Sequence, residues 1–596
     1  MSIWVAGITR GHNAGVCLLK DGEIVFALEE ERLSRHKYDG GPFATMVKIL
    51  EYTDKLDYLV IAHTQDLNES AARIDFTGDD VYTGLARKLG LIDNSPSVDI
   101  YKHPQVVDLS HMHHKLHAAC AFYRSGFDEA AAVIVDGAGT FIDLNIQEQK
   151  ELVWELESIF DCKYPANFTT KWKHLGGRGP WQGGYISDMP SDKYDEQGTH
   201  ECIIDDTAGI VKAYEAVTQY CGWSSIEAGK TMGLFPYGKP NDNIPEIYTD
   251  AGGKWRSSNR HLIIPTYPNG ALVNEGRYEE LESSSIDDLT LLQNRRDMAY
   301  AIQTESQQEV LNVIRQAVEK TGHNKVVISG GYGLNCVANY WYLEQLKDEG
   351  IEIYVEPISN DAGTAMGAAL YAHYNITEDT TVRDFGESLY LGPTYTYSRE
   401  DIEEVANKYN ATISNTSVKE VVDTIRNKNI VAMFQGAAES GPRALGNRTL
   451  MFDPTLEDGK EWVNRIKRRE YFRPFAGSIL HEYAHEWFEM RGLEETPHMM
   501  YAMNCQPGIA EKIPSIIHID GTCRIQTVKQ HQNTSYYSVI EEFYNQTGVP
   551  IIFNTSFNLG GEPLVETLDD ALRTLANSEI EYLYLAEHEL LLTVKN

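Results

Sequence analysis

The stretch HMHHKLHAACAF places four histidines within seven residues, starting at His111. Its small residues favour a helix, and positions i and i+4 of a helix lie on one face, so His113 and His117 point the same way. Such a pair can bind one divalent ion when further ligands come from elsewhere in the chain. The alternative is a histidine-rich helix face that is solvated or packed. We expect His111 and His114 to cap or pack, because they point elsewhere.

Two carboxylates are candidates for the missing ligands. Asp136 ends the apolar run AAAVIVD, where a buried carboxylate is costly unless it is paired or binds an ion. Asp361 begins a glycine-rich helix in SNDAGTAMG, where its ordinary role would be N-capping. Two imidazoles with carboxylates suit iron, manganese or zinc. The spacing alone leaves open whether these residues converge.

Two glycine-rich stretches are candidates for phosphate binding. SGGYGLN follows an apolar run and exposes backbone N–H groups at a helix start, through Gly330, Gly331 and Asn335. EAGKTMGLFPYG places Lys230 where it reaches an anion or closes a surface turn. A plain strand–helix turn is the alternative for the first stretch. Several such loops around one nucleotide are typical of the actin/sugar-kinase/Hsp70 type of ATPase fold.

A basic cluster lies in NRIKRREYFRP, which contains Arg465, Lys467, Arg468, Arg469 and Arg473. Short basic runs are usually solvated or bind polyanions. The formal net charge of −35 argues against broad binding of duplex DNA, so a concentrated phosphate site is the better interpretation. Arginine offers bidentate forks for phosphate and lysine a mobile point charge. Further polar candidates for this site, next to expected turns and strands, are Arg443, Arg524, Asn554 and Ser556.

The elements that must position these residues indicate an α/β fold. A chain of 596 residues predicts two or more domains. Apolar runs alternate with helical patterns, which indicates mixed sheets flanked by helices. A strand, glycine loop and strand occur near the N-terminus and again in AAAVIVDGAGTFIDLNI, which suggests duplicated halves. The residue pattern of the sequence changes near residue 395, and we predict domains at 1–390 and 395–596.

The same sequence predicts a cytoplasmic chain. No run of 18 or more apolar residues is present, which excludes a bilayer-spanning helix. The N-terminus lacks the basic and apolar segments of a signal peptide. Eight cysteines are scattered singly, and Cys17, Cys120 and Cys336 lie in apolar surroundings, which predicts reduced, buried thiols.

Long motifs along nearly the whole chain resemble the O-carbamoyltransferases of the nodulation-factor and tobramycin-tailoring type. In the first part they are GHNAG, EEERLSRHKYD, HHKLHAACAFY, VDGAG, EAGKTMGLFPYG, SGGYGLNC and NDAGTAMGAAL. In the second part they are ESGPRALGNRTLMFDP, NRIKRREYFRPFA, DGTCRIQTV and FNTSFNLGGEPLV. The resemblance implies an actin-type first domain similar to the tRNA threonylcarbamoyl transferases, and a smaller YrdC-like second domain.

The resemblance also implies a two-stage reaction. The second domain makes carbamoyl-adenylate from carbamoyl phosphate and ATP with Mg²⁺, and the first domain transfers the carbamoyl group to an acceptor hydroxyl. The implied residues for carbamoyl phosphate and ATP are Arg443, Lys467, Arg473, Arg524 and Asn554. The implied ligands of a divalent metal, iron (Fe²⁺) first and Mg²⁺ or Mn²⁺ as alternatives, are His113, His117, Asp136 and Asp361.

At the acceptor end the resemblance places His12, while Lys37 would contact carbamoyl-adenylate. Many members have Asp where this chain has Asn13, and an amide cannot act as a carboxylate base. His12 is therefore the better candidate for the acceptor proton, with a satisfied loop histidine as the alternative.

Other functions and partners remain open at this point. A nucleotide-gated ATPase of the same fold would not need the basic residues of the second domain, and the negative charge disfavours a tRNA threonylcarbamoyl-type transferase. Expected partners are ATP, carbamoyl phosphate and a hydroxyl acceptor, with no membrane and with a homodimer as a possibility. The acceptor is a sugar, an antibiotic alcohol, or a hydroxymethylated pyrimidine, free or in DNA. Candidate acceptor stretches are 64–105 and 165–200, the latter containing Trp172 and Trp181.

Overall fold

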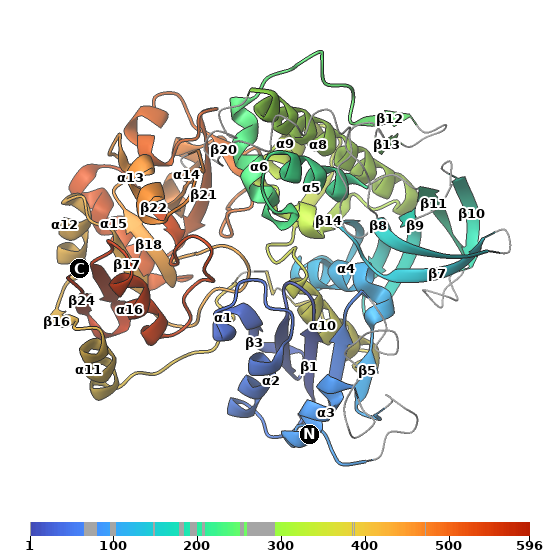
Figure 1. The fold of residues 1–596 in the computed structure, drawn as a ribbon, viewed down its shortest axis with the longest axis horizontal. Helices are drawn as coiled ribbons and strands as arrows, with labels where there is room; N and C mark the ends of the chain where they lie inside the picture. Colours follow the sequence, from blue (N-terminus) through green and yellow to red (C-terminus); the bar gives the residue numbers. More distant parts are fainter. Residues whose placement is uncertain are drawn as a thin grey trace. The chain divides into compact units, whose positions relative to one another are not determined.

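The protein is described from a computed structural model, and it divides into two compact units (Figure 1). The first unit consists of Met1–Val25, Gly40–Ala338 and Asp348–Gly386, and the second of Phe26–Asp39, Asn339–Lys347 and Glu387–Asn596. The structure describes residues 2–64, 80–95, 103–146, 149–177, 184–190, 199–205, 209–250, 256–258, 293–383, 385–386, 388–470 and 472–595.

One sheet of the first unit has the order β3-β2-β1-β4-β5. Its strands are β1 (Trp4–Thr9), β2 (Gly15–Lys20), β3 (Glu23–Glu29), β4 (Tyr58–Ala62) and β5 (Val106–Asp108). β1 is antiparallel to β2 and parallel to β4. The turn between β2 and β3 has positive φ at Asp21 (52°) and Gly22 (83°), as Asp-Gly hairpin turns require.

The second sheet of this unit contains the path β10-β11-β9-β8-β6-β14-β15. Its strands are β6 (Glu129–Val135), β7 (Phe141–Ile146), β8 (Gln149–Lys163), β9 (Asn167–Gly177), β10 (Gly184–Pro190), β11 (Thr199–Asp205), β14 (Lys325–Ser329) and β15 (Glu352–Val355). Within it, β9-β8-β6-β14-β15 repeats the order of the other sheet, with β6 antiparallel to β8 and parallel to β14. This repeat fits the expected actin-type plan, while the duplication itself stays a prediction.

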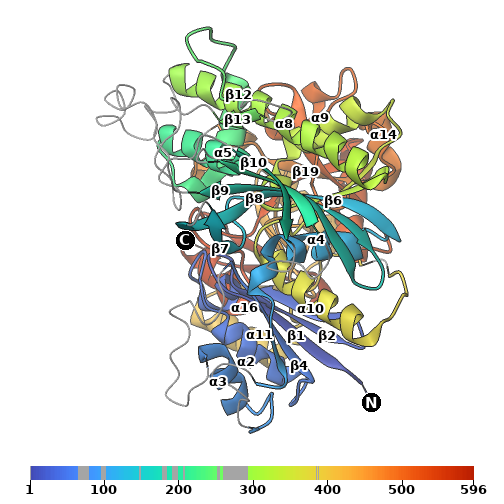
Figure 2. The same ribbon diagram turned by 90° about the vertical axis from the view of Figure 1, so that its right-hand side faces the viewer.

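Two helices, α4 (His113–Arg124) and α10 (Ala362–Thr377), lie side by side between these sheets (Figures 1 and 2). α10 contacts β1, β2 and β4, while α4 contacts β6 and β14. A Cβ atom on Gly367 would lie 1.9 Å from the carbonyl oxygen of Leu116, so only glycine permits this approach. The close contact places the start of α10 beside the first turns of α4. On the second sheet, α5 (Ile210–Tyr220) and α8 (Gln293–Thr321) also contact β8.

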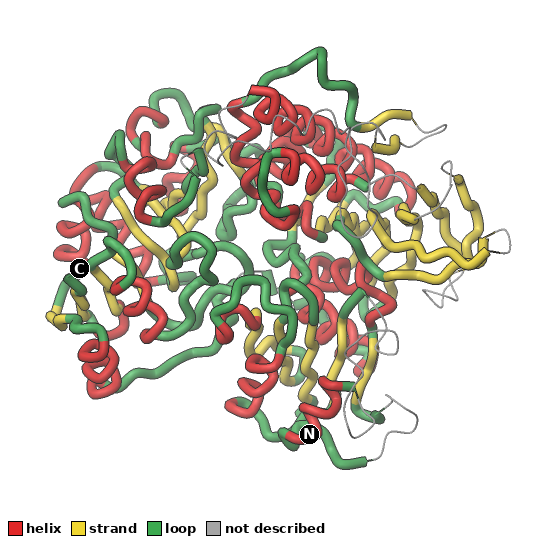
Figure 3. Tube along the Cα trace, viewed as in Figure 1, coloured by secondary structure: helices red, strands yellow, loops and turns green. Residues whose placement is uncertain are grey.

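The second unit is built on a sheet of the order β16-β24-β23-β17-β18-β22-β19-β21-β20. Its strands are β16 (Thr412–Asn415), β17 (Val431–Phe434), β18 (Arg448–Phe452), β19 (Ala476–Leu480), β20 (Ala502–Asn504), β21 (Thr522–Val528), β22 (Ile551–Ser556), β23 (Tyr582–Leu585) and β24 (Leu590–Thr593). Its helices include α11 (Arg399–Lys408), α12 (Val418–Arg426), α13 (Gly459–Ile466), α15 (Thr534–Thr547) and α16 (Leu568–Ala576). Figure 3 shows helices and strands mixed in both units, which confirms the predicted α/β class.

The segment Phe26–Asp39, which contains α1 (Glu30–Ser34), belongs to the second unit. Arg32 donates to the carbonyl oxygen of Gly441 at 2.8 Å, and Arg35 donates to that of Leu564 at 2.6 Å. Lys37 therefore belongs to the same unit as the basic cluster.

Two further predictions concern the whole chain. No disulfide joins any of the eight cysteines, and seven of them are buried, including Cys17, Cys120 and Cys336 as predicted. Within the described ranges, no helix combines the length and apolar character needed to cross a membrane.

Candidate functional site

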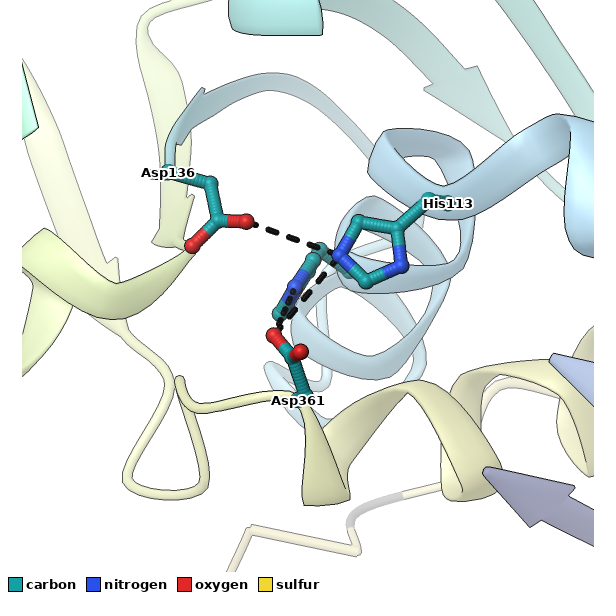
Figure 4. A group of neighbouring side chains, drawn as sticks. His113, Asp136 and Asp361 are labelled. Carbon is teal, nitrogen blue, oxygen red and sulfur yellow. Dashed lines mark ion pairs between the residues drawn. The ribbon is translucent and has the colours of Figure 1, made fainter. Parts of the chain in front are cut away.

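The four predicted metal ligands converge in the first unit, and Figure 4 labels three of them, His113, Asp136 and Asp361. His113 and His117 lie on the first two turns of α4, Asp136 directly follows β6, and Asp361 directly precedes α10. One possible ligand atom from each residue lies within 4.8 Å of the others. We call these four residues the His/Asp site.

The geometry of the His/Asp site fits a bound cation. Nε2 of His113 lies 3.5 Å from Asp136 and 3.6 Å from Asp361, and Nε2 of His117 lies 3.6 Å from Asp361. Both imidazoles are buried, and these Nε2 atoms have no hydrogen-bond partner among the described residues. Buried polar atoms are normally satisfied, so the two nitrogens are available to a ligand. Two imidazoles with two carboxylates are a donor set that suits a divalent transition metal.

The imidazoles and carboxylates of this site shift one another's pKa values. Burial disfavours a charged imidazole, but Asp136 and Asp361 outweigh it and raise the pKa of His113 to about 10. Burial likewise opposes the charge on Asp136, but His113 and His117 hold its pKa well below the usual range. Burial instead lowers the pKa of neighbouring His114 to about 4, and its Nδ1 bonds Ser158 at 2.8 Å. His114 therefore packs, as predicted, and His111 is exposed.

The side chain of Asp361 does not cap the helix that follows it. The residue occupies the position before α10, but its carboxylate accepts no capping hydrogen bond. It faces His113 and His117 instead, and Nδ1 of His12 lies 3.7 Å from it. The His12 side chain is 51 % exposed, so it borders the His/Asp site and still meets solvent.

The predicted Gly330–Gly331 turn contacts the end of β6. Gly330 has a φ of +88°, and a Cβ there would lie 2.4 Å from the carbonyl oxygen of Val135. The Gly331 N–H donates to Asp136 Oδ1 at 3.0 Å. These glycines therefore orient Asp136, and their predicted contact with phosphate stays a prediction.

The other two residues predicted to bind nucleotide have protein partners. Asn335 bonds Gln303 at 3.0 Å and accepts the N–H of Ala338 at 3.1 Å. Lys230, on α6 (Ala228–Leu234), forms an ion pair with Glu227 at 2.8 Å. Their predicted roles require these side chains to bind nucleotide in addition to these partners.

A pair on α5 was not predicted from the sequence. Lys212 Nζ lies 2.7 Å from Glu215, and a Cβ on Gly137 would lie 3.0 Å from that carboxylate. The pair thus borders the residue after Asp136. A lysine and a glutamate three residues apart are an ordinary helix pair, so the sequence carried no signal for it.

The predicted acceptor stretches are described only in part. Trp172 lies on β9, is 3 % exposed and has its ring centroid 6.3 Å from that of His174, which indicates packing. Trp181 lies outside the described residues.

In the second unit Lys467 is buried among other cations. Lys467 follows α13, is 2 % exposed, and donates to Ser556 Oγ and Asn558 Oδ1, each at 3.2 Å. Burial, followed by repulsion from Arg469, Arg473 and Lys37, holds its pKa well below the usual range. Burial and repulsion from Arg473 and Arg524 also depress the pKa of Arg469. We call Lys37, Lys467, Arg469, Arg473 and Arg524 the cationic cluster.

Arg524 and Asn554 lie in one row across the sheet. Both are register partners of Ala476 on β19, which lies between them and has only a methyl side chain. The Asn554 amide donates to the Ala444 carbonyl at 3.0 Å and to Ser478 Oγ at 2.9 Å. Its buried Oδ1 and the Nε of Arg524 have no hydrogen-bond partner among the described residues. Arg443, which precedes Ala444, is half-buried.

The two remaining members of the basic run point to solvent. Arg465 is 65 % exposed and lies 3.4 Å from Glu579, and the exposed Arg468 donates to the Asn577 carbonyl at 3.0 Å. The run therefore divides into a buried part, which contains Lys467, and an exposed part.

Family comparison decides what these two sites belong to. Residues 5–370 match the family model described as Carbamoyltransferase N-terminus, and residues 422–591 match Carbamoyltransferase C-terminus. The chain belongs to the carbamoyltransferase family. It is therefore a transferase, and the resemblance seen in its motifs is confirmed.

Curated relatives extend over most of this carbamoyltransferase. A protein of Synechocystis sp. is 29 % identical, over 96 % of this chain and 94 % of its own. Nodulation protein NolNO of Sinorhizobium fredii is 28 % identical, over 97 % of this chain and 78 % of its own. Nodulation protein NolO of Bradyrhizobium diazoefficiens is 28 % identical, over 79 % of this chain and 76 % of its own.

Solved structures match more weakly. Full-length HypF in a phosphate- and nucleotide-bound form is 14 % identical with a TM-score of 0.34, covering 63 % of this chain and 56 % of its own. A ROK family glucokinase from Streptomyces griseus is 10 % identical with a TM-score of 0.26, covering 61 % of this chain and 98 % of its own. Scores this low support no conclusion about the carbamoyltransferase.

Sequence reasoning missed the residues that shape the ESGPRALGNR loop of the carbamoyltransferase. Glu439 Oε1 accepts the N–H groups of Leu445 at 2.7 Å and Asn447 at 2.8 Å. Arg448 is fully buried and donates to the carbonyl oxygens of Gln435 at 2.6 Å and Gly436 at 3.1 Å. Buried charges whose hydrogen bonds, among the described residues, go to backbone groups fix the shape of the loop that carries Arg443. The motif gave no means of telling Arg443 from Arg448.

Proposed function

We propose that this carbamoyltransferase makes carbamoyl-adenylate from carbamoyl phosphate and ATP in its second unit, and transfers the carbamoyl group to an acceptor hydroxyl in its first. The observation that carries the proposal is the cationic cluster. Burial, followed by repulsion from other members, depresses the pKa of Lys467. An assembly of this kind is stabilised by a multiply charged anion, and the two substrates together supply several negative charges.

In the second unit the cationic cluster brings the two anions together. Lys467 and Arg473 bind phosphate groups, and Arg524 with Arg443 orients carbamoyl phosphate. The free Oδ1 of Asn554 accepts a hydrogen bond from the carbamoyl NH₂ group, and Ser556 holds Lys467 in place. ATP enters with Mg²⁺. Water cleaves carbamoyl phosphate to carbamate and phosphate. A carbamate oxygen then attacks the α-phosphorus of ATP, so that carbamoyl-adenylate forms and pyrophosphate leaves. Lys37 contacts the adenylate.

In the first unit the His/Asp site would hold a divalent ion, with iron expected first. Such an ion supplies positive charge against nucleotide phosphates. Gly330, Gly331, Asn335 and Lys230 contact the nucleotide. His12, which is exposed beside Asp361, takes the proton of the acceptor hydroxyl as the carbamoyl group is transferred and AMP leaves.

The acceptor is proposed from the relatives. Several are nodulation proteins, which favours a sugar-type hydroxyl over a hydroxymethylated pyrimidine. A nucleotide-gated ATPase does not explain the cationic cluster, because such a protein needs no second anion site.

The direct test supplies ATP, carbamoyl phosphate and a panel of hydroxyl acceptors. ATP/pyrophosphate exchange that requires carbamoyl phosphate reports the first stage, and mass spectrometry of the acceptors reports the second. We expect exchange without an acceptor, and a carbamoyl mass gain on a sugar-type hydroxyl. Exchange that does not depend on carbamoyl phosphate contradicts the adenylate stage. A mass gain on a nucleoside alone contradicts the proposed acceptor class.

A further inference from the structure

A buried charged group lies directly behind the His/Asp site, on strand β8. Glu155 is 1 % exposed and forms an ion pair with Lys173, which is 5 % exposed and lies on the neighbouring strand β9. Neither residue belongs to the proposed reaction. A buried ion pair is weak evidence for stability, since an apolar pair of similar size is often at least as stabilising. The role of Glu155 therefore lies in its hydrogen bonds rather than in the ion pair itself.

An irregularity in the sheet brings β8 side chains onto α4. The pairing of β8 with β9 shifts register between Glu155 and Glu157. Glu155 and Ser158 are three positions apart, so in a regular strand they would face opposite sides. Here both reach His114: Glu155 Oε2 accepts its N–H at 3.4 Å, and Ser158 Oγ bonds its Nδ1 at 2.8 Å.

The same carboxylate also holds the loop that follows Asp136. Glu155 Oε2 accepts the N–H of Thr140 at 2.9 Å, and Thr140 Oγ1 in turn accepts the N–H of His113 at 3.0 Å. A Cβ on Gly139 would lie 2.6 Å from Glu155 Oε2, so the loop approaches the carboxylate as closely as glycine allows. One side chain thus joins the loop that carries Asp136 to the first turn of α4.

Lys173 keeps this acceptor charged. Burial alone would raise the pKa of Glu155, but Lys173 and His114 outweigh it and hold the pKa well below its usual range. A carboxylate has acceptor sites on both oxygens, and it can therefore serve Lys173 and the two N–H groups together.

We propose that Glu155 is a positioning residue for metal binding, which fixes His113 relative to Asp136 through Thr140. The proposal rests on the metal site proposed above. Groups that hydrogen-bond to the surroundings of metal ligands typically change metal affinity by about 10–100-fold when mutated.

The chain offers a matched control two residues along the same strand. Glu157 is also 1 % exposed and forms an ion pair with a β9 residue, His174. It accepts the N–H of Ile210, at the start of α5, at 2.7 Å. Its hydrogen bond to Ile210 therefore supports α5, whereas the bonds of Glu155 support α4 and the Asp136 loop.

The test is a titration of the full chain with Mn²⁺, followed by its electron paramagnetic resonance spectrum and by calorimetry. We expect Glu155→Gln to weaken Mn²⁺ binding by about 10–100-fold and to change the spectrum of the bound ion. Glu157→Gln should bind within about threefold of the original chain and give its spectrum. Unchanged affinity in Glu155→Gln, or an equal loss in both variants, overturns the positioning role. Absence of binding by the original chain overturns the metal site itself, which is a distinguishable result.

A second pair of variants applies if Glu155→Gln does not fold. Thr140→Val removes the acceptor for the His113 N–H, and Thr140→Ser keeps it. We expect weaker Mn²⁺ binding in Thr140→Val and an affinity close to the original in Thr140→Ser. Equal affinities in the two Thr140 variants contradict the proposed connection.

Discussion

The two units differ in which charged groups lie next to one another in their interiors. In the first unit, His113 and His117 lie 3.5–3.6 Å from the carboxylates of Asp136 and Asp361, so imidazoles face groups of opposite polarity. In the second unit, Lys467 is buried, and burial followed by repulsion from Arg469 and Arg473 depresses its pKa. The first arrangement fits a cation that takes the place of protons. The second arrangement is completed by an anion.

This difference has a consequence for stability. Neutralising contacts favour the folded state of the His/Asp site, whereas gathered like charges oppose folding of the cationic cluster until a ligand binds. Active sites commonly accept such a cost, because the interactions that destabilise the free protein are those that bind substrate. The two sites should therefore respond differently to mutation, packing and pH.

The largest expected effect separates the two stages. Replacing His113 and His117 together by alanine removes two of the four possible ligands, and we expect carbamoyl transfer to an acceptor to be lost. ATP/pyrophosphate exchange should persist, because it depends on the cationic cluster. His111→Ala is the control, since that side chain is exposed. Transfer that survives in the double variant contradicts the role of the His/Asp site.

The converse variants test the second unit. Lys467→Gln and Arg473→Ala should each lower ATP/pyrophosphate exchange by about 10²–10³-fold, the range seen when one preorganised donor is removed from a catalytic site. Mn²⁺ binding at the first unit should not change. Arg468→Gln, whose side chain is exposed, is the matched control from the same basic run. Near-normal exchange in Arg473→Ala contradicts the assignment.

The same comparison shows which features of the two sites could be predicted from the sequence and which could not. Helical spacing predicted that His113 and His117 point the same way, and both lie beside Asp361, because the geometry of a single helix follows from local sequence. Their convergence with Asp361 depends on the contact of α10 with α4 at Gly367, which no spacing reveals. In the basic run, composition did not distinguish buried Lys467 from exposed Arg468, since burial depends on the residues folded against them.

The remaining features depend on contacts between residues far apart in the sequence, and the sequence alone did not predict them. Glu155 reaches α4 because of a register shift between β8 and β9, and such shifts have no signature in this sequence. The membership of Lys37 in the second unit likewise depends on contacts such as that of Arg35 with Leu564. The family resemblance predicted that Lys37 contacts carbamoyl-adenylate. A single domain boundary near residue 395 does not predict that Lys37 belongs to the second unit.

A change in helix packing should lower metal affinity at the His/Asp site less than loss of the two histidines does. Gly367→Ala puts a methyl group where the Leu116 carbonyl lies, and such overpacking typically costs about 1–3 kcal/mol of unfolding free energy. Because Asp361 precedes the same helix, Mn²⁺ affinity should fall as well. Gly229→Ala is the control: it lies in α6 with open space around it, and it should stabilise by about 0.5–1 kcal/mol. Equal melting temperatures for the two variants contradict the close contact of α10 with α4.

The smallest effect is the dependence of stability on pH at Lys467. Its folded pKa lies well below the ordinary 10.5, because burial and neighbouring cations disfavour the charged form. Between the folded pKa and 10.5 the unfolded chain binds more protons, so this residue makes the ligand-free protein more stable as pH rises through that window. Bound pyrophosphate favours the charged lysine, and it should therefore reduce this slope while stabilising the protein. Urea unfolding of the original chain and of Lys467→Gln, with and without pyrophosphate, measures both effects. The variant should lose the contribution of Lys467 to the slope, and the same slope in both proteins would show that Lys467 is charged without an anion.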